Sequence, residues 1–176
     1  WIEPFPIDGQ KVPTILSLHI NGNNQLRIAL NSSYILSVSV LKADTEIGRV
    51  SEPVITAGSW HHIAVVCKDP LKIYINGVDK TTTQASRIVR AVASCLNIGR
   101  LKPGTAHFEG KIDEVRIWGR ERTREDIQED MNRRLKGDEE GLMGYWRFDK
   151  GSGTVARDVT GKGNDGTLKG NAQWST

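Results

Sequence analysis

Oxygen-bearing side chains and glycines are concentrated in one stretch near the end of the chain, Asp158-Val159-Thr160-Gly161-Lys162-Gly163-Asn164-Asp165. A hard divalent cation such as calcium takes six to eight oxygen ligands, and glycines would let backbone carbonyls turn toward it. The competing interpretation is that the Asp and Asn residues form turns by bonding their own backbone. Lys162 weakens the metal hypothesis, because its ammonium group would compete with the ion.

Paired carboxylates are the second chemistry to test, because retaining glycoside hydrolases need two carboxyl groups about 5–5.5 Å apart on one face. Asp113 and Glu114 are adjacent, so a strand would point them to opposite faces. The acidic residues 138–140 fall in an expected loop. The sequence also contains no serine or cysteine nucleophile motif and no phosphate-binding glycine loop. We therefore predict no catalytic residues and no enzyme.

The adjacent histidines and the two cysteines give weaker signals. On a strand, His61 and His62 would point to opposite faces, so they could not easily chelate one metal ion. Cys67 and Cys95 are compatible with one disulfide bond or with two free thiols. Spacing alone cannot bring two strands together, so the sequence does not decide between these alternatives.

Aromatic side chains could stack on sugar rings if they were exposed. Alternation along residues 112–118 would place Trp118 on the outward face. The following helix could instead cover it with Ile127 or Met131, and we favour this interpretation. The aromatic residues of the strand-like blocks are expected in the core: Trp60, Tyr145 and Trp146.

Length, charge and hydropathy narrow the functional classes. The chain has 176 residues, near the usual size of one domain. Its 24 basic and 21 acidic residues give a net charge of +3, too small and too interspersed to predict nucleic-acid binding. Arg87, Arg90, Arg100 and Lys102 could form a basic rim for acidic glycans, but nothing in the sequence brings them together. No apolar run approaches the ~20 residues of a membrane span, and a start at Trp1 suggests an excised domain or a processed product.

Most of the chain has the pattern of short β-strands separated by tight turns. Apolar and polar residues alternate along 26–30 and 34–40, and 61–67 and 71–75 are denser apolar runs. Period-two alternation with β-branched residues is typical of half-buried strands. Turn-forming dipeptides punctuate the strands: Asp8-Gly9, Asn21-Gly22, Asn76-Gly77 and Asp165-Gly166. Many short strands with such turns predict a sandwich or a barrel.

One short helix is predicted near 123–136. Thr123 can cap its start, and Asp126 three residues later completes a box-like N-terminus. Apolar residues then recur on one face at a spacing of four, at Ile127, Met131 and Leu135. Gly137 supplies the predicted stop.

Three sequence blocks carry a resemblance to a known family. The first is GSWHHIAVV at 58–66 followed by IYING at 73–77. The second is LNIGR at 96–100 followed by FEGKIDEVRIW at 108–118 and the helix. The third is LMGYWRFD at 142–149, continuing to Leu168. In combination they resemble the laminin-G-like jelly-roll family of the concanavalin A-like lectin/glucanase superfamily, with pentraxins as more distant relatives.

The resemblance implies an all-β fold for residues 1–176, a two-sheet antiparallel jelly-roll sandwich with one short α-helix. The block order is unusual, because the third block normally opens the domain in this family. The chain is then either a circular permutant or one period of a tandem array cut out of register. We favour closure by residues 142–174 of the same chain, because the loop entropy of closure rises slowly with length. Closure implies a monomer, and a shared segment implies a strand-exchanged oligomer.

The resemblance also implies a non-catalytic binding module, extracellular or at the cell surface. Its expected partner is a glycan, the alternative is an extracellular protein bound by an adhesion repeat, and a glycoside hydrolase is less favoured. Related domains often carry a structural calcium ion (Ca2+). Carried over, this nominates Asp158 and Asn164 as ligands, with Asp113 or Asp149 as further carboxylates. Neither the sugar nor the binding face follows from the sequence.

Overall fold

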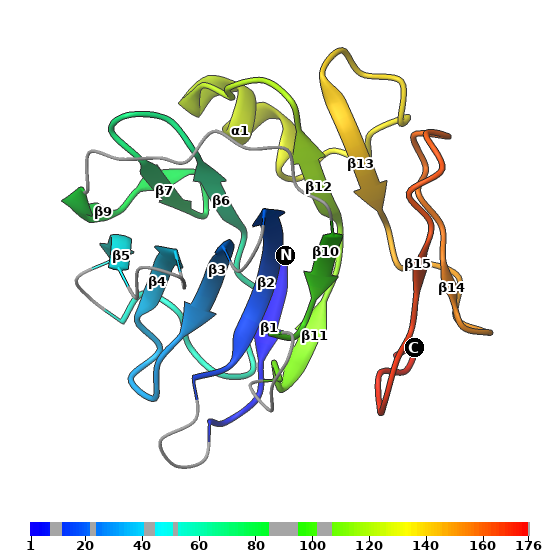
Figure 1. Ribbon diagram of the computed structural model, residues 1–176, viewed down its shortest axis with the longest axis horizontal. Helices are drawn as coiled ribbons and strands as arrows, with labels where there is room; N and C mark the ends of the chain where they lie inside the picture. The colour runs from blue at the N-terminus through cyan, green and yellow to red at the C-terminus, as the bar shows by residue number, and fades with distance from the viewer. Residues whose placement is uncertain are drawn as a thin grey trace.

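The computed structural model describes residues 1–7, 12–21, 24–40, 45–50, 53–84, 95–101 and 107–175. Over these residues the chain forms antiparallel β-strands in two layers, with one short helix (Figure 1). The all-β class predicted from the alternating pattern is therefore confirmed. No helix in this part of the chain is long and apolar enough to cross a membrane.

One layer is a six-stranded sheet in the order β10-β2-β3-β4-β5-β9, with every neighbouring pair antiparallel. Its strands are β2 (Thr14–Asn21), β3 (Asn24–Leu30), β4 (Leu36–Val40), β5 (Thr45–Val50), β9 (Thr81–Gln84) and β10 (Cys95–Ile98). Apolar residues of β3 and β4 alternate with polar ones and point to one side. These two strands thus turn their larger apolar side chains toward the core.

The second layer is assembled from shorter pieces. They are β6 (Ile63–Val66), β7 (Lys72–Ile75) and β8 (Val78–Asp79); β1 (Ile2–Pro4) with β11 (Gly110–Ile112); and β12 (Val115–Trp118) with β13 (Leu142–Trp146). Ile2 and His61 exchange backbone hydrogen bonds of 2.9 and 2.8 Å, which join β1 to the segment before β6. β1, β11 and the sheet of β6 to β8 share one core with the six-stranded sheet. β12 and β13 pack instead around a separate cluster of Leu135, Leu142 and Tyr145.

The main core lies between the two layers. Leu30, Leu36 and Val38 of the six-stranded sheet belong to one buried cluster with Ile2 and Ile73 of the second layer. Each of these side chains is at most 2% exposed, and burying one contributes roughly 1.5–3 kcal/mol. Since both layers supply one core, the predicted two-sheet jelly-roll sandwich is confirmed.

The helix α1 (Arg124–Asp130) begins where the sequence predicts. The Thr123 hydroxyl accepts a hydrogen bond from the Asp126 backbone N–H at 3.1 Å. The Asp126 carboxylate accepts one from the Thr123 backbone N–H at 3.0 Å, which completes the capping box. Ile127 packs against Val66 and thereby fixes the helix to the second layer.

The helix ends earlier than the predicted span of 123–136. Leu135 does not continue the face of Ile127, because it packs with Leu142 in a separate buried cluster. This contact draws the chain away from the helix axis. Gly137 is therefore not the helix stop; it lies beyond the end, and a Cβ there would meet backbone atoms of Val159.

Of the predicted turn dipeptides, one closes a hairpin and another does not. Asn76-Gly77 joins β7 to β8 with φ angles of 51° and 74°, as a two-residue hairpin turn requires. Asp165-Gly166 closes no hairpin, because Gly166 begins β15 (Gly166–Thr167) and Asp165 accepts a hydrogen bond from the Asp158 backbone N–H. Asp8-Gly9 and Gly22 lie outside the described residues.

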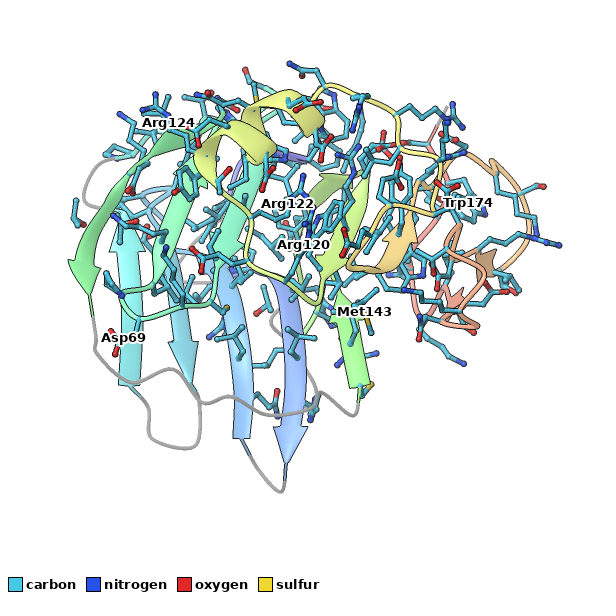
Figure 2. The ribbon with its side chains drawn as sticks, turned by 90° about the horizontal axis from the view of Figure 1, so that it is seen from above. Asp69, Arg120, Arg122, Arg124, Met143 and Trp174 are labelled. Atoms are coloured by element: carbon cyan, nitrogen blue, oxygen red, sulfur yellow. The ribbon has the colours of Figure 1, made fainter. Side chains whose placement is uncertain are left out.

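The C-terminal segment stands at one side of the sandwich (Figure 1). It contains β13 and the small hairpin of β14 (Val155–Ala156) with β15. β13 pairs antiparallel with β12 of the same chain, with Val115 opposite Trp146. From above, Trp174 of this segment lies on the side opposite Asp69 (Figure 2). The permutation and tandem-array explanations both stay predictions.

Candidate functional site

The outer face of the six-stranded sheet carries a row of polar side chains across four neighbouring strands. Asn97 of β10 lies opposite Ser17 of β2, which in turn lies opposite Arg27 of β3. Ser39 of β4 continues the row beyond Arg27. Residues directly opposite on adjacent strands point to the same face, with Cβ atoms about 4.5–5.5 Å apart. We call Asn97, Ser17, Arg27 and Ser39 the polar row.

A chain of hydrogen bonds fixes one end of the polar row. The Asn97 side-chain Nδ2 donates to Ser17 Oγ at 3.4 Å. Ser17 is fully buried, and its hydroxyl donates to the Arg100 backbone carbonyl at 3.0 Å. The Asn97 side chain is thereby tied to β2 and, through Ser17, to the Arg100 backbone.

Arg27 is fixed in the same way in the middle of the polar row. Its Nε donates to Thr14 Oγ1 at 2.8 Å, and its Nη2 donates to the Val12 backbone carbonyl at 2.5 Å. Burial lowers the pKa of Arg27 from its ordinary value, but a guanidinium stays protonated at neutral pH. The sheet therefore holds a positive donor group at a defined position.

The polar row suits a ligand rich in hydroxyl groups. An amide, a guanidinium and a hydroxyl supply both donors and acceptors, and each ligand hydroxyl can donate one hydrogen bond and accept two. Groups that are already tethered lose little conformational entropy on binding. The sequence shows the alternating polar positions, but it does not show which residues of different strands become neighbours.

The two adjacent histidines face opposite sides, as predicted. His61 is buried, and its Nε2 accepts a hydrogen bond from the Thr56 backbone N–H at 3.1 Å. The His62 ring packs edge-on against Trp1, with ring centroids 5.3 Å apart. Burial lowers the pKa of His62 to about 3, so the ring is neutral at physiological pH. Both rings have packing roles.

Asp158 is the centre of the stretch 158–165 and is only 7% exposed. Its Oδ1 accepts hydrogen bonds from the backbone N–H groups of Tyr145 and Thr160, both at 3.0 Å. Its Oδ2 accepts one from Asn164 Nδ2 at 2.9 Å, and the Thr160 hydroxyl lies 2.8 Å from both oxygens. Burial opposes ionisation, but these hydrogen bonds outweigh it and hold the pKa of Asp158 below its ordinary value.

The remaining carboxylates have other partners. Asp113 Oδ1 accepts a hydrogen bond from the Glu114 backbone N–H at 2.8 Å, and burial raises the pKa of Asp113. Glu114 forms a 2.7 Å ion pair with Arg116. Asp149 forms an ion pair with Arg134 on the exposed surface. The acidic side chains at the junction of β11 and β12 are therefore engaged with the protein itself.

The predicted calcium ligands do not form one cluster. Asp158 contacts Asn164, whereas Asp113 and Asp149 take no part in those contacts. N–H and O–H donors occupy both oxygens of Asp158, and Lys162 Nζ donates to a backbone carbonyl of β13 at 2.6 Å. As arranged, these groups do not fit a cation, which would have to displace them. In the described ranges, no three His, Cys, Asp or Glu side chains gather as a metal site. The calcium site stays a prediction.

Of the three aromatic residues that were predicted to be in the core, two are buried and one is exposed. Tyr145 and Trp146 are buried, as predicted. Trp60 is 42% exposed, so its predicted core position is wrong. His61, the next residue, is buried and pairs with Ile2 of β1, whereas Trp60 directly follows the turn at 57–58.

Trp118 is partly covered, and Ile127, one of the two residues predicted to cover it, belongs to another cluster. It packs against the cluster that contains Leu135, and the Arg122 guanidinium lies 4.0 Å from its ring centroid. A cation–π contact from Arg122, labelled in Figure 2, thus adds to the apolar contact with this cluster.

The cysteines and the basic residues add no site. Cys67 and Cys95 are both free and exposed, so free thiols are the correct alternative. The Arg100 backbone pairs with His107. The other residues of the proposed basic rim lie outside the described residues: Arg87, Arg90 and Lys102.

Comparison with family models identifies the chain's relatives. The model described as the concanavalin A-like lectin/glucanases superfamily matches residues 1–128. The chain belongs to this superfamily. The match covers both layers of the sandwich and ends within α1, before the C-terminal segment. A comparison with curated protein sequences found no match.

A solved structure shares the superfamily fold. It is the crystal structure of a Bacteroides ovatus protein named for a suspected role in carbohydrate binding. The two chains are 20% identical and superpose with a TM-score of 0.63 over 99% of this chain. This chain spans 58% of the length of that protein. At this identity the likeness establishes the fold alone.

Proposed function

We propose that the chain is a non-catalytic carbohydrate-binding module of a secreted or cell-surface protein, and that it binds its glycan at the polar row. The observation that carries the proposal is the alignment of Asn97, Arg27 and Ser39 on one outer sheet face, with the first two fixed by hydrogen bonds. Superfamily membership and the fold shared with the Bacteroides ovatus protein support a binding role. The extracellular location rests on the resemblance to laminin-G-like domains.

The state of the carboxylates supports a role without catalysis. A retaining hydrolase needs one ionised nucleophile and one proton donor about 5–5.5 Å apart. Glu114 is held by Arg116 and by the Tyr145 hydroxyl, and Asp158 is surrounded by donors from its own loop. Neither carboxylate is left free to act on a substrate.

Isothermal titration with the glycan that binds best tests the proposal. Each lost hydrogen bond to the ligand weakens binding by about tenfold, because 1.4 kcal/mol corresponds to a factor of ten. We expect Asn97→Ala and Ser39→Ala each to weaken binding by about that factor. Lys80→Ala, an exposed change in the turn after β8, is the matched control and keeps the wild-type affinity.

Unchanged affinity in both polar-row variants would place the glycan elsewhere and reject this site. An absence of glycan binding in the wild-type protein would instead favour the alternative of a protein-interaction or adhesion repeat.

A further inference from the structure

The turn between β3 and β4 carries a chemical motif that the proposed function does not use. Asn31-Ser32-Ser33 has the form Asn-x-Ser with a residue other than proline in the middle, which is the acceptor pattern of N-linked glycosylation. Asn31 is the only asparagine of the 176-residue chain that serine or threonine follows two positions later. The pattern is short, so its place in the fold decides whether it can be modified.

The motif lies at the end of a hairpin, beyond the paired strands. Leu30 of β3 pairs with Leu36 of β4, and residues 31–35 form the connection. Ser32 and Ser33 are exposed, and Asn31 is partly exposed. A transferase must take the acceptor segment into its own active site, which a residue inside a sheet does not allow. The motif meets this requirement, because it begins where the strand pairing ends.

Backbone hydrogen bonds define the shape of this turn. The Tyr34 backbone N–H donates to the Asn31 carbonyl at 2.9 Å, and the Asn31 backbone N–H donates to the Ile35 carbonyl at 3.0 Å. Tyr34 has a φ angle of 59°, so a β-turn followed by a left-handed residue makes a three-residue hairpin loop. The Tyr34 hydroxyl also accepts a hydrogen bond from the Ile7 backbone N–H at 3.1 Å. The motif therefore has a defined place in a hydrogen-bonded turn.

The Asn31 carboxamide is oriented by its oxygen atom. Oδ1 accepts hydrogen bonds from the backbone N–H groups of Ser33 at 2.9 Å and of Ile35 at 3.0 Å. Both partners are donors, so the oxygen and not the nitrogen must occupy this position. The bond to Ser33, two residues on, forms an Asx-turn.

The amide nitrogen is the end of this carboxamide that is left to react. Within the described part of the chain, Asn31 Nδ2 donates no hydrogen bond. It is also not among the buried polar atoms of that part that lack a partner, so it keeps contact with solvent. The folded turn thus directs Oδ1 toward the backbone and leaves Nδ2 open.

We propose that Asn31 is an acceptor site for N-linked glycosylation when the chain is exported through a glycosylating compartment. The donor is an oligosaccharide linked to a lipid pyrophosphate. A bond forms between Asn31 Nδ2 and the anomeric carbon of the first sugar, the bond from that carbon to the pyrophosphate oxygen breaks, and Nδ2 loses one proton. The Ser33 hydroxyl completes the recognition pattern. The proposal rests on the export of the proposed function, but it concerns a sugar that is attached covalently rather than bound.

The attachment point is separate from the polar row. Arg27 of the row lies opposite Ser39, and Asn31 follows Arg27 by four residues along the chain. At about 3.3 Å per residue of strand, this is a distance of roughly 13 Å. A glycan at Asn31 therefore covers the end of the β3–β4 hairpin and leaves the polar row open.

Secretion of the chain from a eukaryotic host, followed by mass spectrometry, tests the proposal. We expect most secreted wild-type chains to gain the mass of one oligosaccharide, which peptide N-glycosidase removes while leaving a carboxylate at position 31. Asn31→Gln and Ser33→Ala each abolish this gain. Ser33→Ala is the sharper variant, because it keeps the backbone N–H that bonds Asn31 Oδ1. Ser33→Thr keeps the modification. Ser32→Ala, an exposed change at the middle position of the motif, is the matched control and also keeps it.

The outcomes separate this proposal from glycan binding at the polar row. Folded, secreted wild-type protein without a sugar at Asn31 overturns the acceptor site. A gain in mass that persists in Ser33→Ala also overturns it, because the sugar would then be attached elsewhere. Calorimetric titration of the same preparation, before and after enzymatic removal of the oligosaccharide, measures binding at the polar row, and we expect equal affinity. An absence of binding in both samples rejects the polar row but leaves the acceptor site supported.

Discussion

Replacing Asp158 by alanine tests whether this carboxylate organises the C-terminal segment. The variant removes the acceptor for the Tyr145 backbone N–H, a buried hydrogen bond, and for donors from Thr160 and Asn164. An unsatisfied buried donor costs about 1–3 kcal/mol, and the more accessible donors recover part of their loss by bonding water. We expect a total loss of about 3 kcal/mol. For a chain of this size that lowers Tm by roughly 6–12 °C.

Urea unfolding followed by tryptophan fluorescence measures this loss. Asp149→Ala is the matched control, because both side chains of its ion pair with Arg134 are exposed. Exposed ion pairs contribute at most about 1 kcal/mol to stability. An Asp158→Ala loss under about 1 kcal/mol, equal to the control, would refute the reasoning. It would mean that water replaces the carboxylate at little cost.

The same variant predicts a pH dependence. The hydrogen bonds hold the pKa of Asp158 in the folded state below its ordinary value, even though burial acts in the opposite direction. The unfolded chain therefore takes up the proton at higher pH than the folded chain. The stabilisation is complete above the ordinary aspartate pKa of about 4 and is lost as the pH falls through the folded pKa. The stability difference between wild type and Asp158→Ala should accordingly shrink below about pH 4.

Three further predictions concern single elements. Gly110→Ala should destabilise the protein by about 3 kcal/mol or more, because the added Cβ would lie 2.4 Å from the Glu3 carbonyl oxygen of β1. Calorimetry measures the loss, and Gly151→Ala is the control, because a Cβ at Gly151 would have no atom within 4 Å. Thr123→Ala should cost about 1 kcal/mol in urea unfolding through the lost cap, and no change would show that the capping box is dispensable. The calcium hypothesis predicts that calcium raises the Tm of the wild type but not of Asp158→Asn, and an unchanged wild-type Tm would reject it.

The sequence correctly predicts the strands and the helix start that depend only on residues close together in the chain. Alternation along 26–30 and 34–40 places β3 and β4, because period-two burial is a property of the single strand. The cap at Thr123 depends only on residues up to Asp126, so the start of α1 is also correct. Its end is not, because Leu135 packs with Leu142 and Tyr145 of β13 and not with Ile127, which the helical spacing alone does not show.

The candidate sites depend on contacts that no local pattern contains. Asn97 and Ser17 are 80 residues apart in the sequence, and only the pairing of β10 with β2 makes them neighbours. Trp60 shows the same limit: its block resembles framework sequence, but Trp60 is exposed, whereas the next residue, His61, is buried and pairs with β1. Strand register therefore determines which residues form the polar row.

The central claim is that this chain binds carbohydrate, and a glycan-array screen of the purified wild-type protein tests it most directly. The account predicts selective binding to a set of related glycans, reduced for Asn97→Ala and unchanged for Lys80→Ala. Binding to no glycan by a correctly folded protein would contradict the claim.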